Sequence, residues 1–246
     1  MEAALQPQIW IAMAATLLAG IARGFTGFGA AMTLAPVFAI LYSAPQAVAT
    51  TAALGMLASL QLLPGAIRDT DWREIVPLTL AAWVTIPLGA LLLLSLEPDL
   101  MRRGISGLVL VLVLLLMSGW PYPVRPGLWG ATGTGALAGL LNGATGVGGP
   151  PVVLYLLGGH KGARSNRANL ITYFTTLNGG TCVSLYFHGV YTLETVWRTL
   201  SLWPVQILSL WAGAWLFRHA SDRIYRHIAL GMLLAIALLG LFYRRG

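Results

Sequence analysis

The fold of this chain is decided by two glycine-rich stretches, Arg23-Gly24-Phe25-Thr26-Gly27-Phe28-Gly29 and Asn142-Gly143-Ala144-Thr145-Gly146-Val147-Gly148-Gly149. Both contain the pattern Gly-x-Thr-Gly-x-Gly, and aligning Gly24 with Gly143 brings the other identical residues into register. The two stretches lie nearly half of the 246-residue chain apart. Matched positions at that spacing indicate an internal duplication.

Apolar runs flank both stretches. The first stretch lies between runs 8–22 and 30–42, and the second between runs 127–141 and 151–158. The whole chain is 57% hydrophobic and only 9% charged, with a mean hydropathy of +0.75, whereas soluble domains carry about 25% charged residues. Because so much apolar surface needs lipid as its solvent, we expect a membrane protein whose longer runs cross the bilayer.

The sequence predicts an all-α polytopic membrane protein made of two repeats. The repeats, residues 1–120 and 121–246, would each hold about four hydrophobic segments and together form one transport domain. Each repeat starts with two short apolar runs around its glycine-rich break, which predicts a re-entrant helical hairpin.

The distribution of basic residues favours inverted repeats over parallel ones. With re-entrant hairpins the halves are inverted and nine basic residues fall on one face, whereas a single broken crossing helix would make the halves parallel and divide the charges almost evenly. The positive-inside rule prefers the uneven division and places both termini outside the cytoplasm. The predicted cytoplasmic residues are Arg68, Arg73, Arg125, Lys161, Arg164, Arg167, Arg218, Arg223 and Arg226, and the five on the other face are Arg102, Arg103, Arg198, Arg244 and Arg245.

The two breaks are the predicted site. Irregular backbone at membrane depth leaves amides and carbonyls unpaired, so it survives only around protein or a wet cavity. A helix that restarts after each break would point free N–H groups and its positive dipole end into that cavity, which suits a small anion. The predicted binding residues are Arg23, Gly24, Thr26, Gly27, Gly29, Asn142, Gly143, Thr145, Gly146, Gly148 and Gly149, with Gln61, Asn169, Tyr173 and Asn178 as weaker candidates along the path.

Arg23 is the sharpest single candidate, because it lies between apolar runs with no acidic residue near it in the sequence. A cation at membrane depth costs about 2.5–3.5 kcal/mol or more, and a bound anion would offset that cost. Two plainer interpretations stay open. Arg23 could reach the interface or cap backbone carbonyls, and the glycines could serve only helix packing.

Several classes of function are excluded or disfavoured. The sequence has no soluble basic domain of the kind that binds nucleic acid. It also has no cluster of ligand residues of the kind that holds a metal or cofactor. The single cysteine, Cys182, excludes an intramolecular disulfide. The carboxylates fall in predicted loops or at segment ends, which argues against a buried proton relay. No nucleophile with a base, and no pair of acids, is evident at depth, so we do not expect an enzyme.

At these residues the chain resembles the TauE/SafE family of sulfite exporters, also called the 4-TMS sulfite/organosulfur (TSUP) family. The resemblance rests on Gly24–Pro36 with Ala47–Thr51 in the first half, and on Gly143–Pro151 with Lys161–Thr172 in the second. It implies a bacterial inner-membrane protein of about eight spans that exports or takes up sulfite, thiosulfate or related sulfonates.

Residues and resemblance together predict an exporter of a small sulfur-containing anion, with the lipid bilayer as its environment and a homodimer left open. An inside-negative potential would itself drive anion exit, by about 2.3 kcal/mol per charge per 100 mV, so no coupling ion is needed. An anion channel, or a carrier for another small oxyanion or a carboxylate, uses the same features and stays the alternative.

Overall fold

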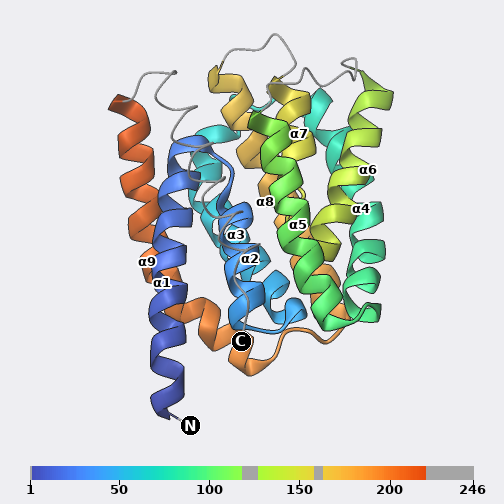
Figure 1. The fold of residues 1–246 in the computed structure, drawn as a ribbon. Coiled ribbons are helices and arrows are strands. Elements are labelled where there is room, and N and C mark those ends of the chain that lie inside the picture. The colour runs from blue at the N-terminus through green and yellow to red at the C-terminus, as the bar shows by residue number, and fades with distance from the viewer. Residues whose placement is uncertain (1, 118–126, 158–162, 220–246) are drawn as a thin grey trace.

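The computed structural model describes residues 2–117, 127–157 and 163–219, apart from a few side chains such as that of Thr26. All secondary structure in these ranges is helical (Figure 1). The helices are α1 (Glu2–Thr26), α2 (Ala30–Leu41), α3 (Ala44–Ala66), α4 (Trp72–Ser95), α5 (Pro98–Met117), α6 (Leu128–Thr145), α7 (Gly149–Leu157), α8 (Ala163–Phe187) and α9 (Leu193–His219).

The helices expose apolar side chains outward, as a protein dissolved in lipid does. Within the described ranges three segments are long and apolar enough to cross a bilayer, namely Gln8–Phe25, Ala44–Ala66 and Trp72–Ser95. Large apolar side chains such as Val84 and Trp211 lie on the outer surface, where water would make them costly and acyl chains would not. The chain is a multi-pass membrane protein.

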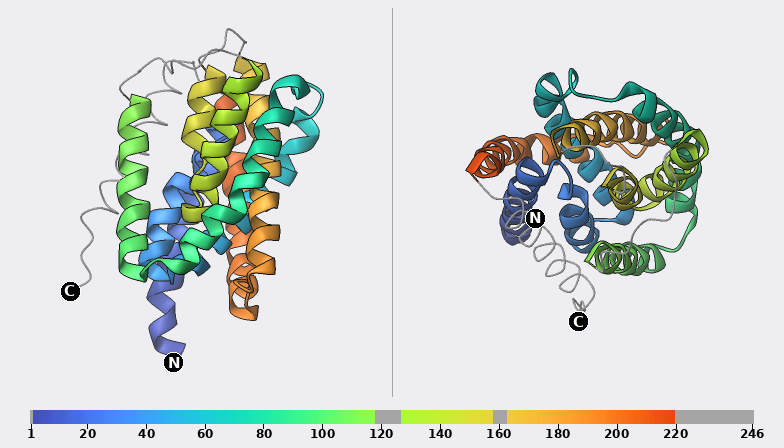
Figure 2. Two further views of the ribbon diagram at one scale, coloured as in Figure 1. Left: turned by 90° about the vertical axis from the view of Figure 1, so that its right-hand side faces the viewer. Right: turned by 90° about the horizontal axis from the view of Figure 1, so that it is seen from above.

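Helices from the two halves of the chain are packed against each other. α1 lies along α9, α4 lies along α6, and α3 packs on α8 in the middle of the molecule. The view from above in Figure 2 shows the short helix α7 among the longer helices, and the short helix α2 packs on α1, α3 and α5. Neither half of the chain could therefore bury its apolar faces in this way without the other.

Glycines let two of these helix pairs approach closely. A Cβ on Gly24 of α1 would collide with the carbonyl oxygen of Leu210 in α9, and one on Gly143 of α6 would collide with that of Ile86 in α4. Small residues at such seams are typical of transmembrane helix pairs, because backbones in contact maximise van der Waals attraction where lipid supplies no hydrophobic force.

The interruptions are shorter than the sequence suggested. Arg23, Gly24 and Thr26 belong to α1, and Asn142, Gly143 and Thr145 belong to α6. Helical hydrogen bonding continues through these residues, since the Gly27 amide donates to the Arg23 carbonyl at 2.7 Å and the Gly146 amide donates to the Asn142 carbonyl at 2.8 Å. Only residues 27–29 and 146–148 lie between helices.

Two glycines turn the chain at these interruptions. Gly27 has φ of 81° and Gly146 has φ of 74°, a left-handed conformation that side chains with a Cβ rarely adopt. After each turn the chain restarts as a helix, α2 or α7, as the sequence predicts. Pro150 and Pro151 lie in the first turn of α7, where a missing amide breaks no helical hydrogen bond.

Candidate functional site

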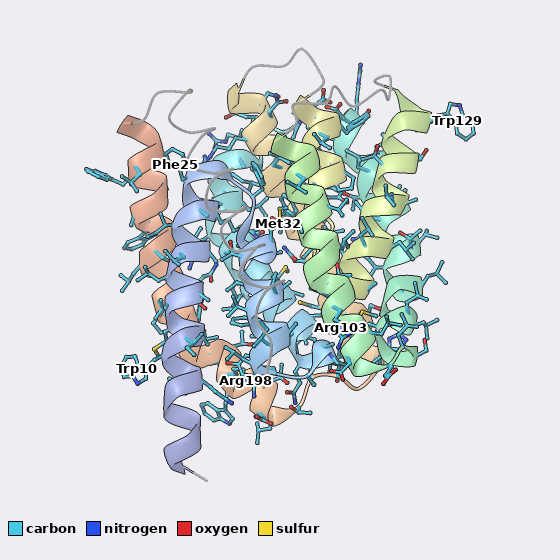
Figure 3. All side chains as sticks on the ribbon, in the orientation of Figure 1. Trp10, Phe25, Met32, Arg103, Trp129 and Arg198 are labelled. Carbon is cyan, nitrogen blue, oxygen red and sulfur yellow. The ribbon has the colours of Figure 1, made fainter. Side chains whose placement is uncertain are left out.

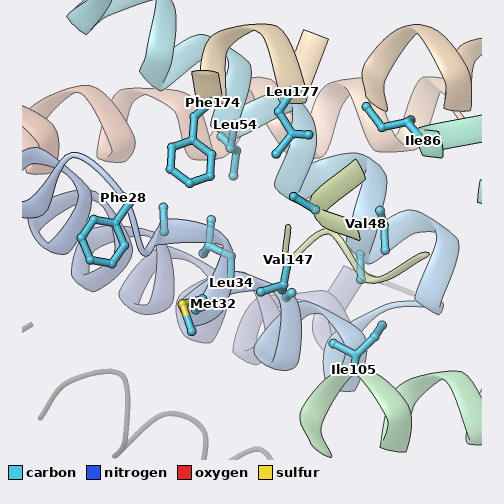
Figure 4. Packing of buried hydrophobic residues seen from close by; sticks show 14 of the residues in the cluster. Phe28, Met32, Leu34, Val48, Leu54, Ile86, Ile105, Val147, Phe174 and Leu177 are labelled. Carbon is cyan, nitrogen blue, oxygen red and sulfur yellow. The ribbon is translucent and has the colours of Figure 1, made fainter. Parts of the chain in front are cut away.

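A small cavity lies where the two interruptions meet. The centre of a water-sized sphere can move through about 20 Å³ of it, which is room for a water molecule or a small ion. Its wall combines both interruptions with α3 and α8, and Figure 4 shows several of its apolar residues. The lining residues are Arg23, Phe28, Gly29, Ala31, Met32, Thr51, Gly55, Asn142, Val147, Gly148, Gly149, Phe174 and Asn178.

Arg23 supplies the charge of this cavity. It is 3% exposed, donates from Nη2 to Oγ of Ser59 in α3, and lies 5.6 Å from the centre of the Phe174 ring. Its Nε atom has no hydrogen-bond partner, and no carboxylate in the described ranges pairs with it. A guanidinium keeps its charge under nearly all conditions, so a cation faces this space without a counter-ion from the described residues.

The start of α2 adds backbone donors next to Arg23. The amides of Ala30, Ala31 and Met32 have no preceding helical carbonyl, because they form the first turn of α2. The first turn of α7 has fewer free backbone amides. Pro150 and Pro151 have no N–H group, so only one half of the site offers a full set of free amides.

Asn142 takes the position that Arg23 holds in the other half, but its side chain is already engaged. Its Oδ1 accepts from the Gly148 amide at 3.1 Å, and its Nδ2 donates to Oγ1 of Thr181 at 2.7 Å. Thr145 acts similarly, since its hydroxyl accepts from the Val147 amide at 3.2 Å while donating to Leu141. Both side chains hold the second interruption in shape.

Six of the predicted residues lie in the wall of the cavity. They are Arg23, Gly29, Asn142, Gly148, Gly149 and Asn178. The others are placed elsewhere. Gly24 and Gly143 lie in the helix seams, Gly27 and Gly146 form the turns, and the Thr26 side chain falls outside the described part. The cavity wall also does not include Thr145, Gln61, Asn169 or Tyr173.

Some residues of the site carry no signal that sequence reasoning could use. Ser59 and Phe174 reach Arg23 from helices far along the chain. Thr51 is 2% exposed with an unpartnered hydroxyl; the sequence marks it as one of several polar residues on the helices after the hairpins, but it does not separate those that line the path from those that bond to neighbouring helices. Phe28 and Val147 were within the quoted stretches, but apolar residues gave no reason to single them out.

At both ends of the molecule, linkers between helices hydrogen bond to the central helices α3 and α8. At one end the linker between α3 and α4 is bound to α8, through Thr70 with Thr172 at 2.7 Å and the Asp71 amide with Asn169 at 2.7 Å. At the other end the hydroxyl of Tyr191, in the linker between α8 and α9, donates to the Ala49 carbonyl of α3 at 3.0 Å.

These features define a multi-pass helical membrane protein with a buried, positively charged cavity between two interrupted helices. Within the described residues, no group of three or more His, Cys, Asp or Glu side chains could hold a metal ion. The chain belongs to the sulfite exporter TauE/SafE family, whose model matches residues 12–239. That family is one of membrane transporters, not of enzymes. Searches among curated proteins and among solved structures gave no significant match.

Proposed function

We propose that this chain exports a small sulfur-containing anion such as sulfite or an organosulfonate, and that the anion binds in the cavity between the interruptions. The observation that carries the proposal is the buried Arg23 guanidinium, which lines the cavity without a carboxylate partner among the described residues. A buried cation is tolerated only when something compensates it. A bound anion supplies that compensation, and the amides at the start of α2 add donors.

Two inverted repeats, residues 1–120 and 121–246, form the transport domain of this proposal. The supporting observation is that the two glycine seams match: Gly24 meets Leu210 and Ala214, while Gly143 meets Ile86 and Ala90. Each pair combines the first helix of one half with the fourth of the other. Figure 3 labels Trp10, near the start of α1, and Trp129, near the start of α6, at opposite ends of the molecule, as inverted repeats require.

Each repeat starts with a re-entrant hairpin in this proposal, α1 with α2 and α6 with α7. Supporting it, α2 has only 12 residues and α7 only 9, which at about 1.5 Å per residue is far short of a 30 Å bilayer. A short helix that starts at the cavity therefore returns to the side from which the hairpin entered.

The end that carries the linker between α3 and α4 faces the cytoplasm in this proposal. Arg68 lies in that linker, Arg73 lies just after it, and Arg167 lies in the first turns of α8, which hydrogen bonds to the same linker. The positive-inside rule favours this side. The N-terminus then lies on the other side, as the charge count predicts for both termini, and the membrane would be the bacterial inner membrane.

A carrier explains the cavity better than a channel does. A channel needs a continuous path, whereas this cavity is small, and at each end of the molecule a linker hydrogen bonds to a central helix and would act as a closure. Opening one contact while the other holds would expose the anion to one side at a time. The membrane potential would drive exit without a coupling ion.

Proteoliposomes test the proposal. The full chain is reconstituted, loaded with radiolabelled sulfite, and assayed for efflux and for counterflow under a potential set with valinomycin. We expect saturable counterflow that is lost in Arg23→Gln and kept in Arg198→Gln, since Arg198 pairs with Glu194 at 2.5 Å away from the cavity. Equal activity of Arg23→Gln and the unchanged protein would refute a site at Arg23, and unsaturable flux would indicate a channel.

A further inference from the structure

The charge inventory of the cavity is short. Of the described residues that line it, Arg23 is the only ionisable one, and the rest are glycine, apolar or neutral polar residues. One full positive charge therefore faces any anion that enters. Because the site is buried, water screens a second negative charge on the anion only weakly.

Helix dipoles do not make up for a missing second cation. The partial charge at a helix start comes from its free amides and is worth less than a full ion pair. The start of α7 is further weakened, because Pro150 and Pro151 lack amides and the Gly148 amide is bonded to Asn142. Only α2 contributes a complete first turn.

The rest of the wall favours an anion with one side that is not a charged oxygen. The side chains of Phe28, Met32, Val147 and Phe174 offer apolar surface but no hydrogen-bond donor. Thr51 offers a buried, unpartnered hydroxyl that can donate or accept. A methyl group could rest on the apolar wall, and a protonated oxygen could donate to Thr51.

We propose that the cavity selects singly charged anions, such as hydrogensulfite or a monovalent sulfonate, over doubly charged anions of the same size. The inference rests on the proposed function and specifies its substrate. A monoanion and Arg23 together are electrically neutral, so the loaded site suits the membrane interior. A dianion leaves one buried charge unpaired, which is strongly unfavourable.

Methanesulfonate and sulfate provide a matched pair of probes, because a methyl group replaces one oxygen and the charge changes by one. The purified full chain is titrated with each sodium salt at equal ionic strength, and the thermal unfolding midpoint is followed. We expect methanesulfonate to stabilise the protein at concentrations at least about 100-fold lower than sulfate. Arg23→Lys should keep this preference, Arg23→Gln should lose the methanesulfonate effect, and Arg198→Gln should match the unchanged protein.

A second variant tests the inference by adding a second positive charge to the cavity wall. Thr51→Lys places another cation in the same wall and should raise the affinity for sulfate relative to methanesulfonate. Equal or tighter sulfate binding by the unchanged protein would overturn the inference while leaving an anion transporter intact. If neither salt stabilises the protein, and the vesicles show no counterflow, the proposed function fails and the inference fails with it.

Discussion

The side-chain oxygen of Asn142 accepts a hydrogen bond from the backbone amide of Gly148, at 3.1 Å across the second interruption. Arg23 stands at the matching place before the first interruption, and it donates to Ser59 instead. One half of the site thus uses its polar side chain to hold the backbone, while the other half leaves a charged group in the cavity wall. The two roles can be separated by substitution.

Asn142→Asp should abolish anion binding while preserving the interruption. The carboxylate keeps an acceptor for the Gly148 amide, but it brings a negative charge into the wall that contains Arg23. That charge would compensate the guanidinium in place of the ligand and repel an incoming anion. We expect no methanesulfonate-dependent shift of the unfolding midpoint and no sulfite counterflow. An unchanged shift would mean that the anion binds away from this wall.

Asn142→Ala should have the opposite effect: it should lower the stability of the protein while preserving anion binding. It leaves the Gly148 amide without its acceptor and removes the donor to the Thr181 hydroxyl, which still donates to the Leu177 carbonyl, so we expect a loss of about 1–3 kcal/mol in the free energy of unfolding. The Arg23 charge is untouched, so a methanesulfonate-dependent shift should persist. Denaturation in detergent measures the first effect and ligand titration the second. Full stability of the variant would contradict a structural role for Asn142.

Gly143→Ala should loosen the seam between α4 and α6. The added methyl group would meet the Ile86 carbonyl oxygen, and overpacking of this kind costs about 1–3 kcal/mol. Gly133→Ala in the same helix is the control, because a Cβ there has no neighbour within 4 Å. Thermal unfolding should show a lower midpoint for the first variant only. Equal midpoints would show that the two helices can separate at little cost.

Tyr191→Phe should weaken the closure at the end where α8 meets α9. The ring remains, but the variant loses the hydroxyl that bonds to the Ala49 carbonyl and to the Cys182 sulfur. Losing one such bond, worth about 0.5–1.5 kcal/mol, should raise the open population about 2–10-fold. Cys182, the single cysteine of the chain, lies beside Tyr191 with 3.2 Å between sulfur and hydroxyl oxygen. Its labelling rate with a maleimide therefore reports the opening.

The control for this experiment lies at the opposite end of the molecule. Thr70→Val removes the hydrogen bond to Thr172, so it weakens the other closure and should not accelerate labelling of Cys182. Equal acceleration by both variants would show that the cysteine senses general loosening of the fold. No acceleration by Tyr191→Phe would remove Tyr191 from the closure.

Pro150→Ala should strengthen anion binding by restoring an amide to the first turn of α7. One added hydrogen bond is worth about 0.5–1.5 kcal/mol, so we expect about 2–10-fold tighter binding of methanesulfonate. Pro87→Ala, in an exposed part of α4 away from the cavity, is the matched control and should bind as the unchanged protein does. Weaker binding by Pro150→Ala would show that α7 does not direct amides to the anion.

The membrane class, the two interruptions and the burial of Arg23 beside the first of them could be predicted from the sequence. Apolar content and run length are properties of segments, and a glycine-rich break or an isolated arginine is visible locally. The extent of the interruptions could not be predicted. Residues 23–26 and 142–145 look irregular in composition, yet they remain helical because the following glycine amides close the last turns.

What the sequence by itself determined is that this chain dissolves in lipid, breaks twice at matching glycines and buries a cation beside one break, because solvation and backbone preference act residue by residue. Only the tertiary structure decided what each of those residues meets. It placed Gly24 in a seam with α9, engaged the amide of Asn142, and brought Ser59 and Phe174 to Arg23. Those assignments depend on which helices pack together, and helix packing joins segments that are far apart along the chain.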